Sequence, residues 1–276
     1  MTLLKFSFFF LLPLLLFGCV TRAVQTEALL SAHQDLPNKF EIKEVPFIDQ
    51  SVGYCGPATL TMAMNWAGQK VSVNEVAAQV YTPGLKGTFQ ADMISASRRQ
   101  GLMAVPIQNL SSLLREVSAG HPVIIFENLS VSWAPQWHYG VVLGFDLEKQ
   151  EIIMHSGHNA FYHWDMSKFE RSWMLGDYWG LVVLPAGELA VAAGEMDHVK
   201  AAVGLEQSKK DIEAEKSYQK ILQKWPDNLV SLIGLANLAY KNGKRNLSVD
   251  LLKRAIKAHP DSDAAKHNLA VAQGKK

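Results

Sequence analysis

The sequence predicts an α+β domain followed by a second, all-helical domain. Between residues 55 and 119 apolar side chains recur with the spacing of helices, and from 122 to 184 they follow the shorter spacing of strands. Near the C-terminal end, Pro226 and Pro260 lie 34 residues apart within similar stretches, which indicates a repeat of paired helices. A chain of 276 residues is long enough for two such domains.

Helices are expected before strands in the first domain. A short strand at 45–50 is expected to lead into a helix in which Pro57 occupies the first turn, where its missing N–H is not needed. Ser72 and Glu75 have the spacing of a capping box, which predicts that another helix begins there. The helices expected in this part cover 55–67, 76–81, 89–100 and 112–119.

The second half of this domain has the pattern of a sheet. Its expected strands cover 122–126, 138–145, 151–155 and 179–184. Helices followed by consecutive strands are typical of an α+β fold with an antiparallel sheet. We therefore expect one compact domain over 45–185, and a short linker before the helical repeats at 195–276.

Small and apolar residues mark equivalent positions in the two copies of the repeat. Before Pro226 they are Ala201, Ala202, Leu205, Ala214, Tyr218 and Ile221. Before Pro260 they are Leu235, Ala236, Ala239, Ser248, Leu252 and Ala255. This pattern resembles tetratricopeptide repeats, which implies two repeats and a capping helix at 264–272, with a surface that binds a partner protein. An unrelated helical bundle has the same helical period and is the alternative.

The N-terminal residues have the composition of an export signal. One lysine precedes a short apolar run that ends near Phe17, so residues 1–18 are expected to be a signal peptide, with a short membrane anchor as the alternative. The stretch LFGC at 16–19 resembles the bacterial lipobox, whose cysteine is acylated. That resemblance implies lipidation of Cys19, a tether over 19–44, and a lipoprotein on the periplasmic side of the cell envelope. Val20 after the cysteine resembles the pattern that is sorted to the outer membrane.

Composition excludes several kinds of partner. Lys and Arg number 27 against 26 Asp and Glu, so the formal charge of +1 gives no global field that would attract nucleic acid. No glycine-rich phosphate loop or zinc-spaced cluster occurs, and the three histidines at 155, 158 and 163 lack a matching ligand set. We expect neither a cofactor nor a bound metal.

Cys55 is the cysteine left for chemistry once Cys19 is assigned to lipidation. It begins a predicted helix, where the positive end of the helix dipole lowers the pKa of a thiol. A lone cysteine is more often a small buried side chain, so a nucleophilic role needs a base and an oxyanion donor. Gln50 precedes the helix and has a side-chain amide, while His138 begins an apolar strand, where its ring can face a cleft.

These residues together resemble a known family. DQSVGYCGPATLTMAM at 49–64, with WHYGVVLGFD at 137–146, is similar to the papain-like bacteriocin-processing cysteine peptidases that cleave double-glycine leaders, especially exported relatives fused to tetratricopeptide repeats. The resemblance covers about 45–184. It implies a papain-like α+β fold in which Cys55 is the nucleophile, His138 the base and Gln50 the oxyanion donor.

The expected third member of the site departs from the family pattern. Family members have an Asp or Asn after the next strand, which orients the histidine, whereas this chain has IIMHSGHNA at 152–160. His155 or Ser156 occupies that position, and Asn159 follows. Asp165 and Asp177 are more distant substitutes. A neutral acceptor can still hold an imidazole, so this departure places activity in doubt without excluding it.

The sequence therefore predicts an exported, lipid-anchored cysteine peptidase that acts on a peptide or protein substrate. One alternative is a catalytically silent papain-like module that binds peptides, because the usual orienting acid is missing. Another is a cysteine-dependent acyltransferase, which uses the same thiol and histidine but transfers the acyl group to an amine. A lipoprotein scaffold without a site would show no effect of Cys55→Ala.

Overall fold

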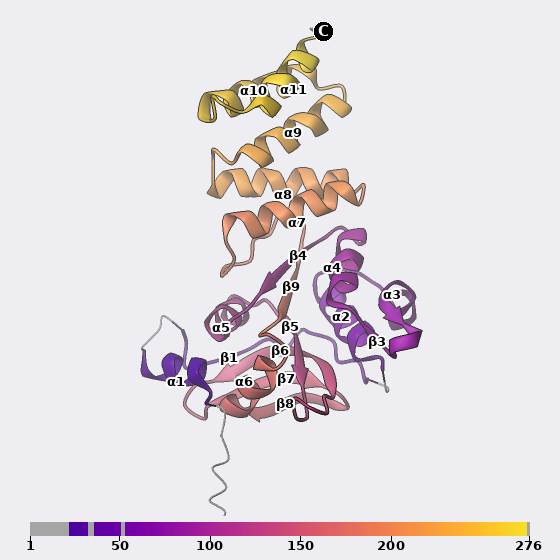
Figure 1. Cartoon of the computed structure of the whole chain (residues 1–276), viewed down its shortest axis with the longest axis vertical. Helices are drawn as coiled ribbons and strands as arrows, with labels where there is room; N and C mark the ends of the chain where they lie inside the picture. The colour runs from indigo at the N-terminus through magenta and orange to yellow at the C-terminus, as the bar shows by residue number, and fades with distance from the viewer. Residues whose placement is uncertain (1–21, 33–35, 51–52, 275–276) are drawn as a thin grey trace, which may run out of the picture.

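The computed structural model describes residues 22–32, 36–50 and 53–274, which form a sheet surrounded by helices and a stack of further helices (Figure 1). The expected signal peptide, the lipobox-like stretch and Cys19 lie outside the described residues. Within the described part of the chain, every helix is too short or too polar to cross a membrane.

The first part contains six α-helices and a single 3-10 turn among the described residues. They are α1 (Val24–Ser31), α2 (Cys55–Trp66), α3 (Val73–Val80), α4 (Gln90–Arg99), α5 (Leu110–Ser118) and α6 (Met166–Met174), with the turn η1 (Pro83–Leu85). The capping box expected before α3 is confirmed. The Ser72 amide donates to Glu75 Oε2 at 2.7 Å, and the Glu75 amide donates to Ser72 Oγ at 3.3 Å.

The expected antiparallel sheet is confirmed, with strand order β4-β9-β5-β6-β7-β8 and a short β1 that also pairs with β6. Its strands are β1 (Lys39–Glu41), β4 (Leu102–Ile107), β5 (Val123–Asn128), β6 (Trp137–Asp146), β7 (Glu151–Ser156), β8 (Asn159–Asp165) and β9 (Gly180–Pro185). Two further strands, β2 (Tyr81–Thr82) and β3 (Gly87–Thr88), form a separate hairpin around η1.

Helix α2 packs on the central strands β5, β6 and β9 of this sheet. Its side chains Leu60, Met62 and Met64 are fully buried, and so are Val141 and Leu143 of β6. Burial of each such side chain stabilises the fold by roughly 1.5–3 kcal/mol. The sheet therefore fixes α2, and with α2 the position of its first residue, Cys55.

Several segments differ from the sequence prediction, which also lacks β1, the β2–β3 hairpin, β8 and α6. Residues 45–50 form no strand, and Gln50 is held there by one backbone hydrogen bond to the Gly157 carbonyl at 3.3 Å. Residues 24–31, expected to belong to a tether, form helix α1. Strand β4 was not predicted because Pro106 interrupts its pattern. Proline lacks an N–H, but the edge position of β4 in the sheet accommodates it.

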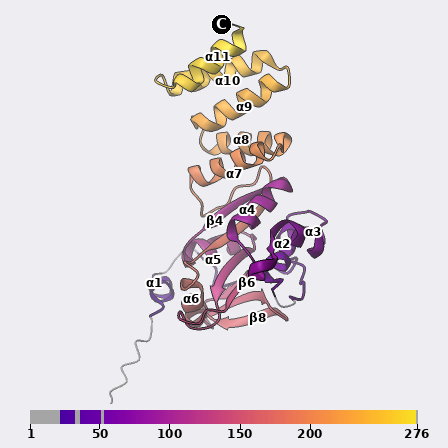
Figure 2. The same cartoon turned by 45° about the vertical axis from the view of Figure 1, so that its right-hand side comes forward.

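The C-terminal part consists of antiparallel helices with a constant offset. They are α7 (Glu195–Gln207), α8 (Asp211–Lys224), α9 (Leu229–Lys241), α10 (Arg245–Ala258) and α11 (Asp263–Gln273). Helices α7, α9 and α11 begin 34 residues apart, and so do α8 and α10. Figure 2 shows these helices stacked in one direction away from the sheet.

The helical stack is packed directly on the first part of the chain. Helix α7 contacts β4 and α4, and one continuous apolar cluster runs from the sheet into α7, α8 and α9. The connecting segment is also held, because the Ala192 amide donates to the buried Glu116 carboxylate at 2.6 Å. The linker expected from the sequence is therefore short and fixed at this point.

Candidate active site

Cys55 is the first residue of α2, and its sulfur lies among backbone N–H groups. Tyr54, the residue before the helix, provides no side-chain cap, and Pro57 has no N–H. A β-carbon on Gly56 would lie 2.6 Å from the Thr88 side chain, so the close approach of β3 to the helix start requires glycine there. The helix therefore begins against the β2–β3 hairpin with the thiol half-buried.

The pKa of the Cys55 thiol is raised above its ordinary value because burial disfavours the thiolate. Hydrogen bonds from the backbone N–H groups of Tyr139, Gly56 and Cys55 itself act in the opposite direction and lower the pKa, but their effect is smaller. The sequence-based expectation that the helix start would lower this pKa is therefore wrong in net direction. The reason is that desolvation of the thiolate raises the pKa more than the N–H groups at the helix start lower it.

His138 lies near the start of β6 and is held by one hydrogen bond. Its Nε2 atom is 3.0 Å from Ser156 Oγ on the neighbouring strand β7. Burial lowers the pKa of His138 to about 4, so the ring is neutral near pH 7. In the tautomer in which Nε2–H donates to Ser156 Oγ, Nδ1 is the ring nitrogen that can accept a proton.

Strand β6 packs on α2 and carries His138 one residue before the position that lies at the cysteine. The residue that follows His138 in the strand is Tyr139, whose backbone N–H donates to the Cys55 sulfur. The hydroxyl of Tyr139 donates to the Thr88 carbonyl at 3.0 Å, which ties β6 to the hairpin beside α2. The thiol and the imidazole therefore belong to adjoining positions at the junction of α2 and β6.

Gln50 lies five residues before Cys55 in the sequence, and its buried side chain has no hydrogen-bond partner in the described structure. Its exposed fraction is 4%, and neither the amide nitrogen nor the amide oxygen makes a hydrogen bond within the described structure. An unsatisfied buried amide costs about 1–3 kcal/mol. An oxyanion donor has this property, because its amide N–H is kept without a partner until it donates to the substrate oxygen.

Of the two residues proposed as third member, the structure brings only Ser156 to His138. His155 is fully buried, with Nε2 3.3 Å from the Val45 carbonyl and Nδ1 accepting from the Phe161 amide. Asp165 caps α6 by accepting from the Lys168 amide at 2.8 Å. The orienting group at His138 is thus a neutral hydroxyl.

The other histidines of this region do not gather into a ligand cluster. His158 pairs with Asp49 at 2.5 Å, and His163 pairs with Glu151 at 2.8 Å. No group of three or more metal-ligating side chains occurs among the described residues.

The tryptophans of the second half divide between core and surface. Trp173 and Trp179 are buried, as expected for core residues, whereas Trp133 is 85% and Trp137 49% exposed. The exposed pair lies on or beside the loop between β5 and β6, which Asn128 fixes by accepting from the amides of Ser130 and Gln136. This loop carries an apolar surface next to His138.

Two residues near His138 were not identified from the sequence. Tyr139 acts through its backbone, so no side-chain pattern indicates its role. Glu127 lies directly opposite His138 in the β5–β6 pairing and is fully buried. The sequence pattern that could have identified Glu127 is the presence of a charged residue within the apolar stretch VIIFEN at 123–128.

A cysteine at the start of a helix, packed on an antiparallel sheet that carries a histidine and its hydrogen-bonding partner, defines the class of papain-like α+β cysteine peptidase folds. Residues 42–177 match the model of the Peptidase_C39 like family. The family match ends before the helical stack.

Three solved structures are similar to about half of this chain. One, described as a C39-like peptidase from Bacillus anthracis, is 19% identical, with a TM-score of 0.45, over 53% of this chain and 97% of its own. A double-glycine motif protease from an AMS/PCAT transporter, in complex with a leader peptide, is 21% identical, with a TM-score of 0.40, over 52% and 93%. The peptidase domain of Streptococcus ComA, a bifunctional ABC transporter, is 18% identical, with a TM-score of 0.43, over 51% and 99%. No curated protein matches the sequence.

Proposed function

We propose that the protein is an exported, lipid-anchored cysteine peptidase that cleaves a peptide bond with Cys55 as nucleophile and His138 as base. The observation that carries the proposal is the junction of α2 and β6. There the backbone N–H of Tyr139, the residue next to His138, lies at the Cys55 sulfur, and His138 Nε2 is 3.0 Å from Ser156 Oγ. The match of residues 42–177 to a model of a peptidase family supports the same reaction class.

In the proposed reaction both groups begin neutral. His138 Nδ1 accepts the proton of the Cys55 thiol as the sulfur attacks the substrate carbonyl, and the resulting oxyanion is bound by the Gln50 amide and the Cys55 backbone N–H. The imidazolium then protonates the leaving amine. Water, deprotonated by His138, hydrolyses the thioester and restores the thiol. Ser156 keeps the ring in the orientation that this proton transfer needs.

The exposed residues around the site suggest where a substrate lies. Trp133 and Trp137 lie on or before the start of β6. Leu85, 62% exposed, lies in the turn of the β2–β3 hairpin, and Phe89, 53% exposed, follows β3 directly. Apolar walls on both sides of a catalytic pair suit the side chains of an extended peptide.

The remaining parts of the proposal concern anchoring and recruitment. The lipobox-like residues 16–19 support acylation of Cys19, and with it a place in the bacterial cell envelope. The constant 34-residue offset of helices supports tetratricopeptide repeats, whose concave surface would bind a substrate or partner protein.

The proposal is tested with the full chain purified in detergent and incubated with a peptide library, whose products are identified by mass spectrometry. We expect cleavage that Cys55→Ala and His138→Ala abolish. Gln50→Ala should lower the rate roughly 10²- to 10³-fold, as the loss of an oxyanion donor does elsewhere. An acyl group transferred to an added amine, without hydrolysis, would indicate an acyltransferase.

The raised pKa of the Cys55 thiol and the neutral partner of His138 favour a second candidate, a silent peptide-binding module. This candidate predicts that the folded protein binds library peptides with equal affinity before and after Cys55→Ala and cleaves none of them. Cleavage that depends on Cys55 excludes it.

A further inference from the structure

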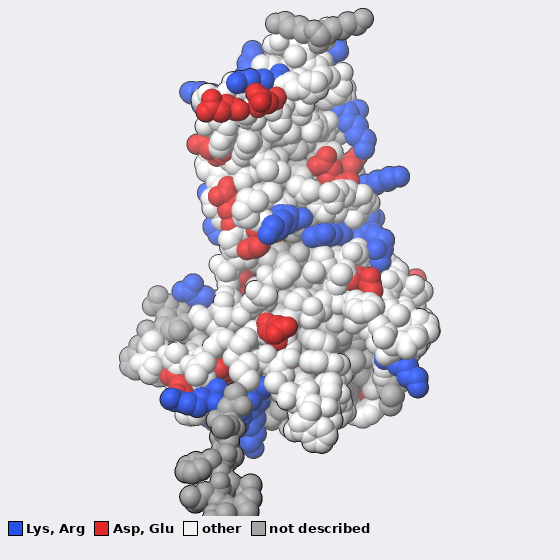
Figure 3. Space-filling view, viewed as in Figure 1, with Lys and Arg blue, Asp and Glu red and all other residues white. Residues whose placement is uncertain are grey.

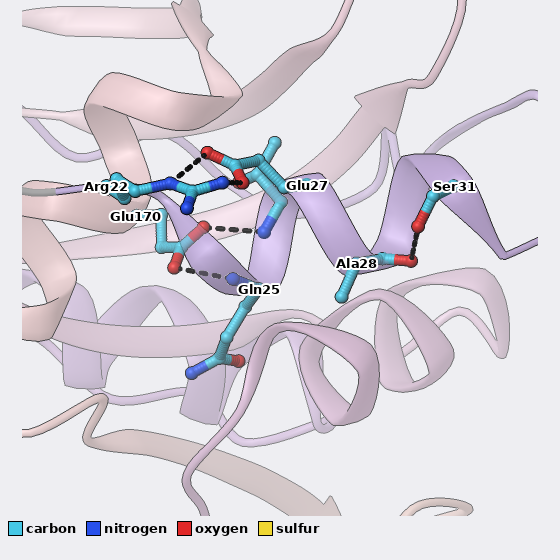
Figure 4. A network of polar contacts seen from close by, with 7 residues as sticks. Arg22, Gln25, Glu27, Ala28, Ser31 and Glu170 are labelled. Carbon is cyan, nitrogen blue, oxygen red and sulfur yellow. Dashed lines mark hydrogen bonds and ion pairs between the residues drawn. The ribbon is translucent and has the colours of Figure 1, made fainter.

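The N-terminal end of α1 is fixed to α6 by a buried carboxylate. The backbone amides of Gln25 and Thr26 donate to Glu170 at 2.9 and 2.6 Å (Figure 4). These are N–H groups of the first helical turn, which have no partner inside the helix, and Glu170 is 1% exposed. Glu170, 144 residues further along the chain than Thr26, therefore takes the role of the N-terminal cap of α1.

A second contact fixes the same turn from another side. The Gln25 side-chain oxygen accepts from the backbone amide of Leu110, the first residue of α5, at 2.7 Å. Arg22, just before the helix, pairs with Glu27 at 2.5 Å (Figure 4). The first turn of α1 is thus fixed to both α5 and α6.

Cys19 precedes Arg22 by three residues. Because a chain spans at most about 3.3–3.6 Å per residue, the Cα atom of Cys19 lies no more than about 11 Å from that of Arg22. A lipid on Cys19 would accordingly bring the bilayer surface close to the end of α1. A long flexible tether, which would let the domain rotate freely above a membrane, is excluded by this reach.

The surface around the end of α1 has the charge that suits lipid headgroups. Lys and Arg side chains surround the point where the described chain begins (Figure 3). Arg22 has 74% of its side chain exposed, and α6 contributes Lys168 and Arg171. Three acids lie here as well: Glu170 is buried against the α1 amides, Glu27 pairs with Arg22, and Asp165 accepts from the Lys168 amide. Lys168 and Arg171 are the basic side chains of this face for which the described residues provide no ion pair.

We propose that this face, formed by the start of α1 and by α6, lies on the bilayer that holds the Cys19 lipid, with Lys168 and Arg171 near anionic headgroups. The inference rests on the proposed lipidation of Cys19. Helix α11 lies at the opposite end of the molecule from α1 and α6 (Figures 1 and 2). The peptidase domain is then the membrane-proximal part, and the helical stack projects away from the membrane.

The test uses the full acylated protein in vesicles of phosphatidylethanolamine and phosphatidylglycerol that contain a lipid with a headgroup quencher. In a Cys55→Ser background, with Cys19 acylated, a fluorophore is attached through Ser167→Cys on α6 or through Lys266→Cys on α11, so that Lys168 and Arg171 are retained. We expect quenching at position 167 to exceed quenching at position 266 several-fold. Equal quenching at the two positions would overturn the proposal.

Two variants test the cause of the orientation. Twenty Gly and Ser residues inserted between Thr21 and Arg22 give a coil of roughly 25 Å, which should remove most of the difference between the two positions. Glu170→Ala should reduce the difference by freeing α1, whereas the matched change Glu188→Ala, on an exposed residue, should not. A difference that persists unchanged in the insertion variant contradicts the short-tether argument.

The mass of the N-terminal peptide separates this inference from its premise. Absence of acyl chains on Cys19 overturns both the proposed anchor and the orientation. An acylated protein that cleaves no peptide leaves the orientation standing and contradicts only the proposed reaction.

Discussion

Glu127 is a buried acid placed opposite the candidate base. Its Oε2 atom lies 2.9 Å from Ser172 Oγ, which is also 2.8 Å from the Asn128 carbonyl, and its Oε1 atom has no partner in the described structure. One hydroxyl proton cannot serve both contacts, so both are satisfied only when a protonated Glu127 donates to Ser172 and Ser172 donates to Asn128. Burial accordingly raises the pKa of Glu127 to about 8.

This carboxyl makes stability depend on pH. Between about pH 4.5 and 8 the folded state keeps a proton that the unfolded state releases, so the free energy of unfolding falls as pH rises, at most ~1.4 kcal/mol per pH unit. Glu127→Gln keeps a donor for Ser172 but does not titrate. We expect urea unfolding from pH 5 to 8 to lose this slope in the variant, so that the variant is the more stable protein at pH 8.

The matched control is Glu188→Gln, on an exposed residue, which should keep the slope of the parent protein. A parent and a Glu127→Gln variant with parallel pH profiles would show that Glu127 is ionised in the fold.

The burial of Cys55 and His138 also has a measurable consequence. The pKa of the thiol is raised above its ordinary value of 9.0, and that of His138 is lowered to about 4, so the pair is neutral at pH 7. We expect the rate of Cys55 alkylation by iodoacetamide to rise with pH and to reach half its maximum above pH 9. His138→Ala should leave this midpoint nearly unchanged although it abolishes cleavage.

A midpoint below pH 9 that moves upward in His138→Ala would instead indicate a thiolate–imidazolium pair. Ser156→Ala serves as the comparison, because it frees the ring without removing it and should not shift the midpoint.

Among the elements, the start of the second helical repeat illustrates how closely the helices pack. A β-carbon on Gly234 of α9 would lie 2.6 Å from two ring atoms of Tyr218 on α8. The Tyr218 ring is 1% exposed, and its hydroxyl donates to Glu206 at 2.7 Å, so it has little room to move. The helix therefore needs a residue without a side chain at this crossing.

Gly234→Ala consequently sets two effects against each other. Alanine favours a helix by roughly 1 kcal/mol, but overpacking a buried contact costs about 1–3 kcal/mol. We expect a net loss of roughly 1 kcal/mol in urea unfolding. Asn237→Ala, on the exposed side of the same helix, should change stability by less than about 0.5 kcal/mol. A more stable Gly234→Ala protein would contradict the contact.

Elements with a distinct apolar face could be predicted from the sequence, and others could not. Helices α2 to α5 and the four central strands follow clear periodicities. Strand β8 is exposed at most positions, so it has no buried face to produce an alternation, and α1 is a single short helix that depends on Glu170 for its first turn. Such segments gain their structure from distant residues, which local patterns do not contain.

The candidate site shows the same limit at single-residue resolution. Gln50, Cys55 and His138 stand out by residue type and spacing, but the choice between His155 and Ser156 depends on which face each side chain takes. The β6–β7 pairing has an irregularity between Val142 and Gly144, and β7–β8 has one between Met154 and Ser156. A shift of one residue reverses the face of a side chain, so the sequence left both residues open.

At the scale of the whole molecule, the two parts form one packed body. The Arg98 side chain of α4 lies against Gly204 of α7, where an added β-carbon would come within 2.5 Å of its Cζ atom. Val199 and Leu205 of α7 belong to the same apolar cluster as Val105 of β4 and Leu184 of β9. The helical stack therefore covers the edge of the sheet and extends its core.

A shared core predicts that the two parts unfold together. Leu205→Ala removes a fully buried side chain from α7 and should destabilise the protein by about 2–5 kcal/mol. In thermal unfolding we expect helix circular dichroism and the near-ultraviolet signal of the sheet tryptophans to move to lower temperature by the same amount. Met196→Ala, at a position 54% exposed on the same helix, is the control and should shift neither signal. If Leu205→Ala separates the two signals into distinct transitions, the helical stack is an independent unit, and the junction at α7 and β4 would not hold the stack in a fixed direction relative to the site.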